Sequence, residues 1–533
     1  MSLLIRNGWL ADGTGNPIYP ADVMIEDDRI VAVEHLPEAR AERTIDAKGK
    51  IVCPGFIDCH SHTDWTIHTN PEMQSTVRQG VTTEIVGNCG FGMAPLSDLS
   101  RTDTEQFLKH FGYAGPVDWS SFAEYLETVG QMKTAENLAY FVGHSAIRAA
   151  VGITTSSHDV TADQMKAMEN HVKAAMDAGA LGMSTGLEYN PGRLASTDEV
   201  IHLSNFVGTY GGIYASHIRN YDEHILSAVK EFVQIIQVSN TCGQLSHLNV
   251  RENTNAPQDA WQDAVSMLES ARERGFDIQT DCVGYENGFG MLAAVLPSWV
   301  MEDGVAQAAI KMKDEGVRQR LRTECDRYWR FLHNGDWFRV TMVQEKPFPE
   351  IVGKNFEEIA ELWGKDPWDC FFDIMAAAGS GMDDLGAVAL LFIEEHVNEM
   401  VSHPLINLEA DFFSSDLNSP LRNCLPFKAS YAGMIHFITC HVRERGTLRL
   451  EEAIRKMTSM PASHFGLRER GQLQKGYFAD VVVLDYENLD DGATDSQPFA
   501  YAKGVEHVIV NGTPVVDHSE HTGARPGRNL LRT

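Results

Sequence analysis

The chain has 533 residues, with 44 Lys and Arg against 74 Asp and Glu, so its formal net charge is -30. Such an acidic chain repels phosphate backbones and anionic lipid surfaces, which argues against nucleic acid and membranes as partners. It has no run of 18 apolar residues and does not begin with the pattern of a secretory signal, so we expect a cytoplasmic protein. Nine scattered cysteines without a CxxC pair predict neither a disulfide framework nor a structural zinc ribbon.

Both ends of the chain have the pattern of β-structure. Residues 1–54 alternate short apolar runs with turn signals, and Val- and Ile-rich runs separated by Gly-Tyr and Asn-Gly turns return near the C-terminus. We therefore predict one small β-sandwich domain built from residues 1–54 and 468–533.

Between these ends, short apolar runs alternate with helix-like stretches, a pattern that predicts parallel strands joined by helices. Eight candidate strands can be counted, the number that closes a (β/α)8 barrel. We therefore expect an α/β fold in which residues 55–467 form a TIM-like (β/α)8 barrel, interrupted by a helical insertion at about 286–410. The candidate strands are 55–62, 81–90, 137–148, 180–186, 212–219, 244–250, 277–285 and 411–416.

Polar side chains able to bind metal or move protons follow nearly all of these apolar runs. Because the carboxyl ends of barrel strands converge on one face, side chains scattered along the sequence are expected to form one cluster. These residues are His60, His62, Cys89, His144, His217, His247 and Asp416.

The pattern of ligand types favours zinc. His60 and His62 are two apart, so on a strand they face the same side. Cys89 lies in GNCGFG, whose glycines allow a sharp turn beside a ligand. A lone Cys is more often a buried thiol, and His217 and His247 could each be core residues. Together with Cys89, however, they supply three N/S ligands and leave a fourth zinc position open, as in catalytic sites.

Asp416 closes the last candidate strand, so it could reach a water molecule on the metal, or the metal itself. The alternative is a helix N-cap, which Pro420 disfavours because it follows so closely. We expect Asp416 to take the proton of the attacking water and return it to the leaving nitrogen. His144 would help to stabilise the oxyanion.

Several of these motifs together resemble the amidohydrolase superfamily, and specifically its D-aminoacylase (N-acyl-D-amino-acid deacylase) family. The resemblance spans nearly the whole chain apart from the insertion. The matching motifs are PGFIDCHSHTDW at 54–65, EIVGNCGFGMAP at 84–95, the Gly-His within 142–148, GLEYNPG at 186–192, SHIR at 216–219, LSHLN at 245–249 and SSD at 414–416.

This resemblance implies a metal-dependent amidohydrolase that cleaves an amide-type C-N bond of a small molecule. Zinc would be held tightly by Cys89, His217 and His247, with a weaker second site near His60 and His62. A hydrolase of neutral amides, carbamates, ureas or cyclic amides is one open alternative, and a non-catalytic scaffold of the same superfamily is another. A homo-oligomer is also compatible with the sequence.

Many members of the superfamily bridge two metals through a carboxylated lysine on strand 4, but residues 180–189 contain no Lys. Glu188 is the nearest carboxylate, and we expect it either to touch metal or to support the site from outside. Candidate substrate contacts are Tyr189, Arg219, Asn249 and Tyr285.

Overall fold

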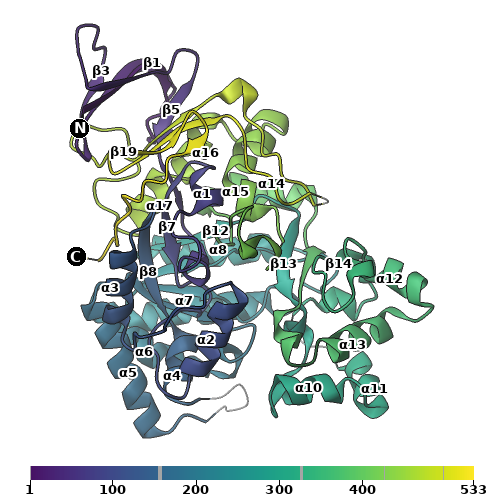
Figure 1. The fold of residues 1–533 in the computed structure, drawn as a ribbon. Helices are drawn as coiled ribbons and strands as arrows, with labels where there is room; N and C mark the ends of the chain where they lie inside the picture. Colours follow the sequence, from purple (N-terminus) through teal and green to yellow (C-terminus); the bar gives the residue numbers. More distant parts are fainter. Residues whose placement is uncertain (1, 154–158, 325–327, 425, 496, 533) are drawn as a thin grey trace.

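The computed structural model describes residues 2–153, 159–324, 328–424, 426–495 and 497–532 (Figure 1). Its strands form three sheets: one of eight parallel strands, one of nine strands and one of three strands. The eight-stranded sheet is the part of the fold that positions the candidate site.

The eight parallel strands follow one another around the sheet in the order of the chain. Just beyond the ends of the first and last strands, an isolated bridge joins the two sheet edges: Ser61 pairs in parallel with Phe412, and the N–H of His62 donates to the carbonyl of Phe412 at 2.7 Å. The predicted α/β barrel is therefore present. Its strands are β6 (Phe56–Asp58), β7 (Val81–Val86), β8 (Asn137–Gly143), β9 (Gly182–Gly186), β10 (Ile213–His217), β11 (Cys242–Leu245), β12 (Ile278–Cys282) and β16 (Ile406–Leu408).

Helices separate the strands, and every residue of β7 and β8 is buried, as expected for parallel strands covered on both faces. The Thr161 side chain accepts from the N–H of Gln164 and so begins α5 with a capping box. Among the described residues, no helix combines the length and apolar character needed to cross a membrane. The helices that follow the barrel strands are α1 (Gln74–Val77), α2 (Arg101–His110), α3 (Phe122–Met132), α4 (His144–Ala150), α5 (Ala162–Asp177), α6 (Thr197–Thr209), α7 (Ile225–Ser239), α8 (Ala260–Glu273), α15 (Ala429–His436), α16 (Leu450–Lys456) and α17 (Ser459–His464).

The last barrel strand lies earlier in the chain than its predicted position at 411–416. The structure places it at Ile406–Leu408, a run of only three residues that gives almost no periodic signal. Phe412 and Phe413, which we interpreted as strand residues, instead pack into an aromatic cluster with Phe427. The stretch 411–416 is therefore the loop that leaves the barrel after its eighth strand.

Between β12 and β16 the chain leaves the barrel and forms a separate group of elements, drawn in teal and green at the right of Figure 1. Its elements include helices and an antiparallel sheet in the order β13-β15-β14, and this sheet is not part of the helical insertion that we expected. In this sheet Phe289 lies opposite Val388. The elements are β13 (Asn287–Met291), α9 (Ser298–Met301), α10 (Val305–Lys311), α11 (Glu315–Thr323), β14 (Val340–Met342), α12 (Phe356–Trp363), α13 (Pro367–Ala378) and β15 (Gly386–Leu390), and α14 (Glu394–Ser402) then leads into β16.

The two chain ends share the nine-stranded sheet, in the order β20-β19-β18-β17-β5-β1-β2-β3 with β4 beside β1. N-terminal and C-terminal strands join where Cys53 pairs with Val482 in antiparallel register. Hydrogen bonds thus connect all nine strands. They are β1 (Ser2–Leu10), β2 (Tyr19–Glu26), β3 (Arg29–Glu34), β4 (Arg43–Asp46), β5 (Ile51–Pro54), β17 (Val481–Leu484), β18 (Val505–Val510), β19 (Thr513–Asp517) and β20 (Glu520–His521).

Candidate metal centre

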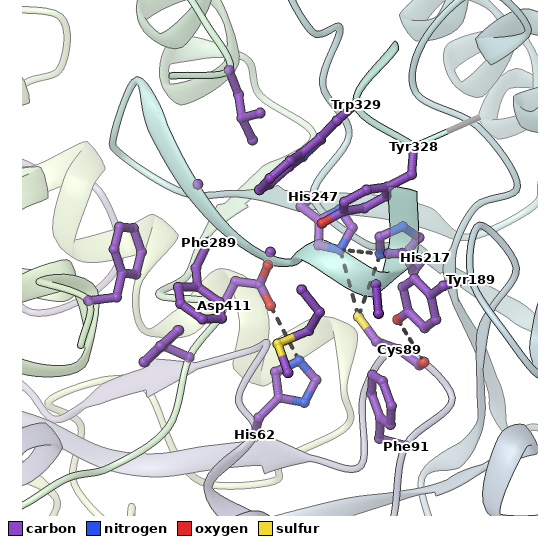
Figure 2. Close-up of a pocket in the computed structure, with 18 of the residues that line it drawn as sticks. His62, Cys89, Phe91, Tyr189, His217, His247, Phe289, Tyr328, Trp329 and Asp411 are labelled. Carbon is purple, nitrogen blue, oxygen red and sulfur yellow. Dashed lines mark hydrogen bonds and ion pairs between the residues drawn. The ribbon is translucent and has the colours of Figure 1, made fainter. Parts of the chain in front are cut away.

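Cys89 lies at the centre of a buried group of histidines at the carboxyl ends of the barrel strands (Figure 2). Its Sγ is 3.1 Å from His60 Nε2, 3.7 Å from His247 Nε2 and 4.0 Å from His217 Nδ1. His217 Nδ1 and His247 Nε2 are 3.1 Å apart. Tetrahedral zinc bonds to sulfur and nitrogen place neighbouring ligand atoms roughly 3.3 to 3.6 Å apart. The spacing of these atoms therefore fits a zinc ion.

A second group of ligand atoms adjoins the first. Side-chain atoms of His60, His62, Cys89 and Asp411 all lie within 4.8 Å of one another. Asp411 Oδ1 is 3.3 Å from His60 Nε2 and 3.4 Å from His62 Nε2. Because Cys89 belongs to both groups, the arrangement has ligands for two neighbouring ions with one shared thiolate.

Three residues of the cluster have left-handed backbone conformations that are rare outside glycine. Their φ angles are 55° for Cys89, 35° for His247 and 46° for Asp411. Each residue comes shortly after a barrel strand, where the chain turns sharply and directs the side chain into the cluster. Strain of this kind costs about 1–3 kcal/mol per residue and concentrates at functional sites.

Carboxylates outside the cluster orient its imidazoles. Glu188 Oε2 lies 2.9 Å from His217 Nε2, and Asp281 Oδ2 lies 3.6 Å from His60 Nδ1. Asp281 also accepts the backbone N–H of His247. A carboxylate that holds one imidazole nitrogen leaves the other as the free ligand atom, as in carboxylate–histidine–zinc arrangements.

The electrostatics of the site favour the ionised forms of its acidic groups. Burial raises the pKa of the Cys89 thiol, but the adjacent His60 and the hydrogen bonds from the other histidines outweigh it and lower that pKa well below its usual range. Burial likewise opposes the ionisation of Glu188, yet the Arg251 guanidinium lowers the pKa of Glu188 to about 2. The surroundings of both groups therefore favour their anionic forms.

The cluster forms the floor of a cavity of about 420 Å³. Tyr189 and Asn249, two predicted substrate contacts, line this cavity. Their polar groups already serve the backbone, because the Tyr189 hydroxyl donates to the carbonyl of Cys89 at 2.9 Å and the Asn249 amide donates to the carbonyl of His247 at 2.5 Å. Both residues thus hold the loops that carry metal-ligand candidates and also contribute to the cavity wall.

The structure brings His60, His62, Cys89, His217 and His247 together, but it places Asp416 elsewhere. Asp416 Oδ1 accepts the backbone N–H of Asn418 at 2.9 Å and the hydroxyl of Tyr501 at 3.2 Å. The carboxylate beside the histidines is Asp411. Because the eighth strand ends at Leu408, the residue that faces the cluster comes five positions before Asp416.

His144 is not among the described residues that line the cavity. Its Nε2 is 2.9 Å from Glu199 Oε1, and Glu199 also accepts two hydrogen bonds from Arg148. All three side chains are buried, His144 and Arg148 in α4 and Glu199 in the first turn of α6. The structure thus places His144 in a buried ion-pair network with Glu199 and Arg148, and not at the described wall of the cavity where we expected it to stabilise the oxyanion.

Arg219 and Tyr285 do not line the cavity either, among the described residues. The guanidinium of Arg219 forms two hydrogen bonds with Glu231, both at 2.9 Å. The ring of Tyr285 stacks on His436 with centroids 4.1 Å apart. Neither residue is placed to contact a substrate beside the cluster. Glu188, which we expected either to touch metal or to support the site, contacts Nε2 of His217, the ring nitrogen that points away from the cluster.

Sequence reasoning missed Asp411, Asp281 and the role of Arg251. Asp411 follows the short run Ile406–Leu408, so the rule that found the histidines would have found it had that run been recognised as a strand. Asp281 lies inside the predicted strand 277–285, whereas the strand-end pattern marks only residues at the carboxyl ends of strands. No local signal marks Arg251, since its partner Glu188 is remote in the chain.

The chain is similar to known proteins in both sequence and fold. The sequence profile of the Amidohydrolase family matches residues 43–323 and 341–516. A D-aminoacylase from Alcaligenes xylosoxydans xylosoxydans is 32% identical over 531 residues, covering 100% of this chain and 98% of that protein. A crystal structure of D-aminoacylase superimposes with a TM-score of 0.82 at 31% identity, over 99% of both chains.

The structure of N-acyl-D-glutamate deacylase from Bordetella bronchiseptica, complexed with zinc and a phosphonate inhibitor that mimics the tetrahedral intermediate, gives a TM-score of 0.82 at 28% identity over 99% of both chains. The family match covers most of the chain, and the likeness extends through the barrel and the end strands alike. The chain therefore belongs to the amidohydrolase family, hydrolases of carbon-nitrogen bonds other than peptide bonds, and resembles the D-aminoacylases within it.

Proposed function

We propose that the protein hydrolyses the amide C-N bond of a small N-acyl amine with the help of bound zinc, in the manner of the deacylases that it resembles. One observation carries the proposal: a thiolate and two imidazoles, from Cys89, His217 and His247, converge at the floor of a cavity. Three N/S ligands with a fourth position open are typical of catalytic zinc sites, whereas structural sites are closed by four.

Cys89, His217 and His247 would hold one zinc ion tightly, because soft thiolate and imidazole ligands favour zinc. His60 and His62, with Asp411, would form a second and weaker position that shares Cys89. A D-aminoacylase of known structure is described as having a binuclear metal centre, in which one metal activates and the second attenuates. A bound zinc ion acts as a Lewis acid, which makes water and a substrate carbonyl more reactive at neutral pH.

Asp411 is the residue of this chain that would move protons. Its carboxylate lies beside both groups of ligand atoms and lines the cavity. It would take a proton from the water that attacks the carbonyl carbon. It would then return that proton to the amide nitrogen, because an amine leaves far more readily than an amide anion. Asp411 thus replaces Asp416 in the proposed mechanism.

The remaining residues orient the reacting groups. Glu188 bonds to Nε2 of His217 so that Nδ1 faces the cluster, and Asp281, whose Oδ2 lies 3.6 Å from Nδ1 of His60, favours the orientation in which Nε2 of His60 faces it. Tyr189 and Asn249 fix the strained turns at Cys89 and His247 through their backbone carbonyls. The cavity walls surround the reacting bond with apolar surface, which strengthens the electrostatic interactions inside it.

The test is release of free amine from N-acyl amides by the purified protein, before and after removal of metal with a chelator. We expect turnover by the zinc-loaded protein, its loss after chelation and its recovery when zinc is added. Undiminished turnover in the metal-free protein would contradict the metal dependence. If the protein released amine neither from N-acyl-D-amino acids nor from neutral amides, the proposed activity would be contradicted.

A further inference from the structure

One wall of the cavity is built from aromatic rings of the barrel loops. The ring of Trp65 lies 4.5 Å from that of His62, measured between centroids, and meets Phe91 edge-on at 5.3 Å. Phe107 and Phe111 stand behind Trp65 at 5.4 and 5.7 Å. The surface next to His62 is therefore aromatic and apolar.

The opposite wall comes from the segment between β12 and β16. Phe289 and Met291 of β13 line the cavity, and so do Tyr328 and Trp329, whose rings stack at 5.1 Å. Figure 2 shows Tyr328 and Trp329 across the cluster from His62. A substrate bound at the metal-ligand candidates would thus lie between two aromatic surfaces.

The cationic side chains of the cavity wall already have anionic or carbonyl partners. Among the described lining residues they are Arg251 and Arg193, apart from histidines. Arg251 holds Glu188 through two parallel hydrogen bonds of 2.9 and 2.7 Å, and it lies 3.6 Å from the buried Asp222. Arg193 donates through Nε and Nη2 to the backbone carbonyl of Glu188, at 3.0 and 2.6 Å.

This distribution of charge disfavours an anionic substrate. A carboxylate in the cavity would lie near the negative charge of Asp411, and Nη1 and Nη2 of Arg251 already bond to Glu188. Burying a carboxylate without such a partner is costly, whereas an apolar group gains from leaving water. The walls therefore complement a neutral, bulky group.

We infer that the preferred substrate is a neutral amide, without a free carboxylate, whose amine part carries an aromatic or branched aliphatic group that packs between Trp65 and Phe289. This inference rests on the proposed amide hydrolysis and specifies its substrate class. It makes the segment between β12 and β16 a determinant of specificity, because that segment supplies Phe289 and Met291.

A matched pair of substrates tests the charge preference: N-acetyl-D-phenylglycine and the corresponding enantiomer of N-acetyl-1-phenylethylamine, in which a methyl group replaces the carboxylate. We expect kcat/KM of the zinc-loaded enzyme to be at least about tenfold higher for the neutral amide, a ratio equivalent to about 1.4 kcal/mol. A higher kcat/KM for the acid would overturn the inference.

Binding to Asp411→Asn, measured by calorimetry with the zinc-loaded protein, separates this inference from the proposed activity. The variant lacks the proposed base, so both compounds stay intact, and removal of a negative charge can only favour the acid. Tighter binding of the neutral amide supports the inference, even if the wild type releases no amine. The absence of amine release would contradict only the proposed activity. Tighter binding of the acid overturns the inference whatever the turnover.

Phe289→Ala tests the aromatic wall, with Phe338→Ala as the control. Phe338 belongs to the same segment, is 43% exposed and does not line this cavity. We expect Phe289→Ala to lower kcat/KM on the order of tenfold for N-acetyl-1-phenylethylamine, but much less for N-acetylisopropylamine, which lacks the ring. Equal losses on both substrates, or the same loss in Phe338→Ala, would show that the wall does not select the ring.

Discussion

Glu188 and His217 form a buried contact that links the metal-ligand candidates to the wall of the cavity. Glu188 Oε2 is 2.9 Å from His217 Nε2, and the same carboxylate accepts two hydrogen bonds from Arg251. The imidazole therefore turns its Nδ1 toward Cys89 and His247. One carboxylate thus sets the orientation of a ligand and neutralises a buried arginine.

Glu188→Gln should weaken zinc binding. An amide cannot accept from His217 and from both nitrogens of Arg251, because one of its ends is a donor. Loss of such an outer contact typically costs about 10- to 100-fold in metal affinity. Competition with a chromophoric chelator measures the zinc affinity directly.

The control for this variant is Glu231→Gln, which breaks a similar bidentate pair with Arg219 away from the cluster. We expect its zinc affinity to match that of the wild type. If Glu188→Gln also bound zinc as the wild type does, Glu188 would have no part in orienting His217.

Replacing Cys89 by Ala should remove the tightly bound zinc and the activity, since both groups of ligand atoms include its thiolate. Cys282→Ala is the matched control, because Cys282 is also a buried thiol and ends the barrel strand β12, but it lies outside these groups. Metal analysis after gel filtration should find zinc in the control only. Full zinc content in Cys89→Ala would refute the proposed centre.

His144→Asn should affect stability rather than turnover. His144 contacts Glu199 inside a buried network, and loss of a hydrogen bond to a charged partner costs about 1.5–3 kcal/mol. A lower free energy of unfolding in urea, with kcat near the wild-type value, is the expected result. A residue that stabilised the oxyanion would instead cost about 10²- to 10³-fold in kcat, and a loss of that size would restore His144 to the mechanism.

Much of the site was predictable because its residues follow apolar runs that are visible in the sequence. His60, His62, Cys89, His217 and His247 come after or at the ends of strands, and barrel topology takes each strand end to the same face. No knowledge of long-range contacts is needed for that step. The chemistry of the cluster could therefore be anticipated from local pattern and strand count.

What could not be predicted depends on weak local signals or on remote contacts. Strand β16 spans only Ile406–Leu408 and has Asn407 between its two apolar residues, so the neighbouring Phe412 and Phe413 gave the stronger strand signal. The carboxylate that we propose for proton transfer was therefore placed five positions too late. The aromatic wall requires β13 to pair with β15, whose residues are far apart in the chain. His144 followed the strand-end rule, but its helix turns the side chain toward Glu199.

The most direct test of the account compares Asp411→Asn with Asp416→Asn in the zinc-loaded enzyme. Both substitutions remove one carboxylate from the same loop, but only Asp411 lies beside His60 and His62. We predict that Asp411→Asn retains the tightly bound zinc and loses at least about 10²- to 10⁴-fold in kcat, the usual contribution of general acid-base catalysis. Asp416→Asn should keep kcat near the wild-type value. Wild-type kcat in Asp411→Asn, or a comparable loss in Asp416→Asn, would contradict the account.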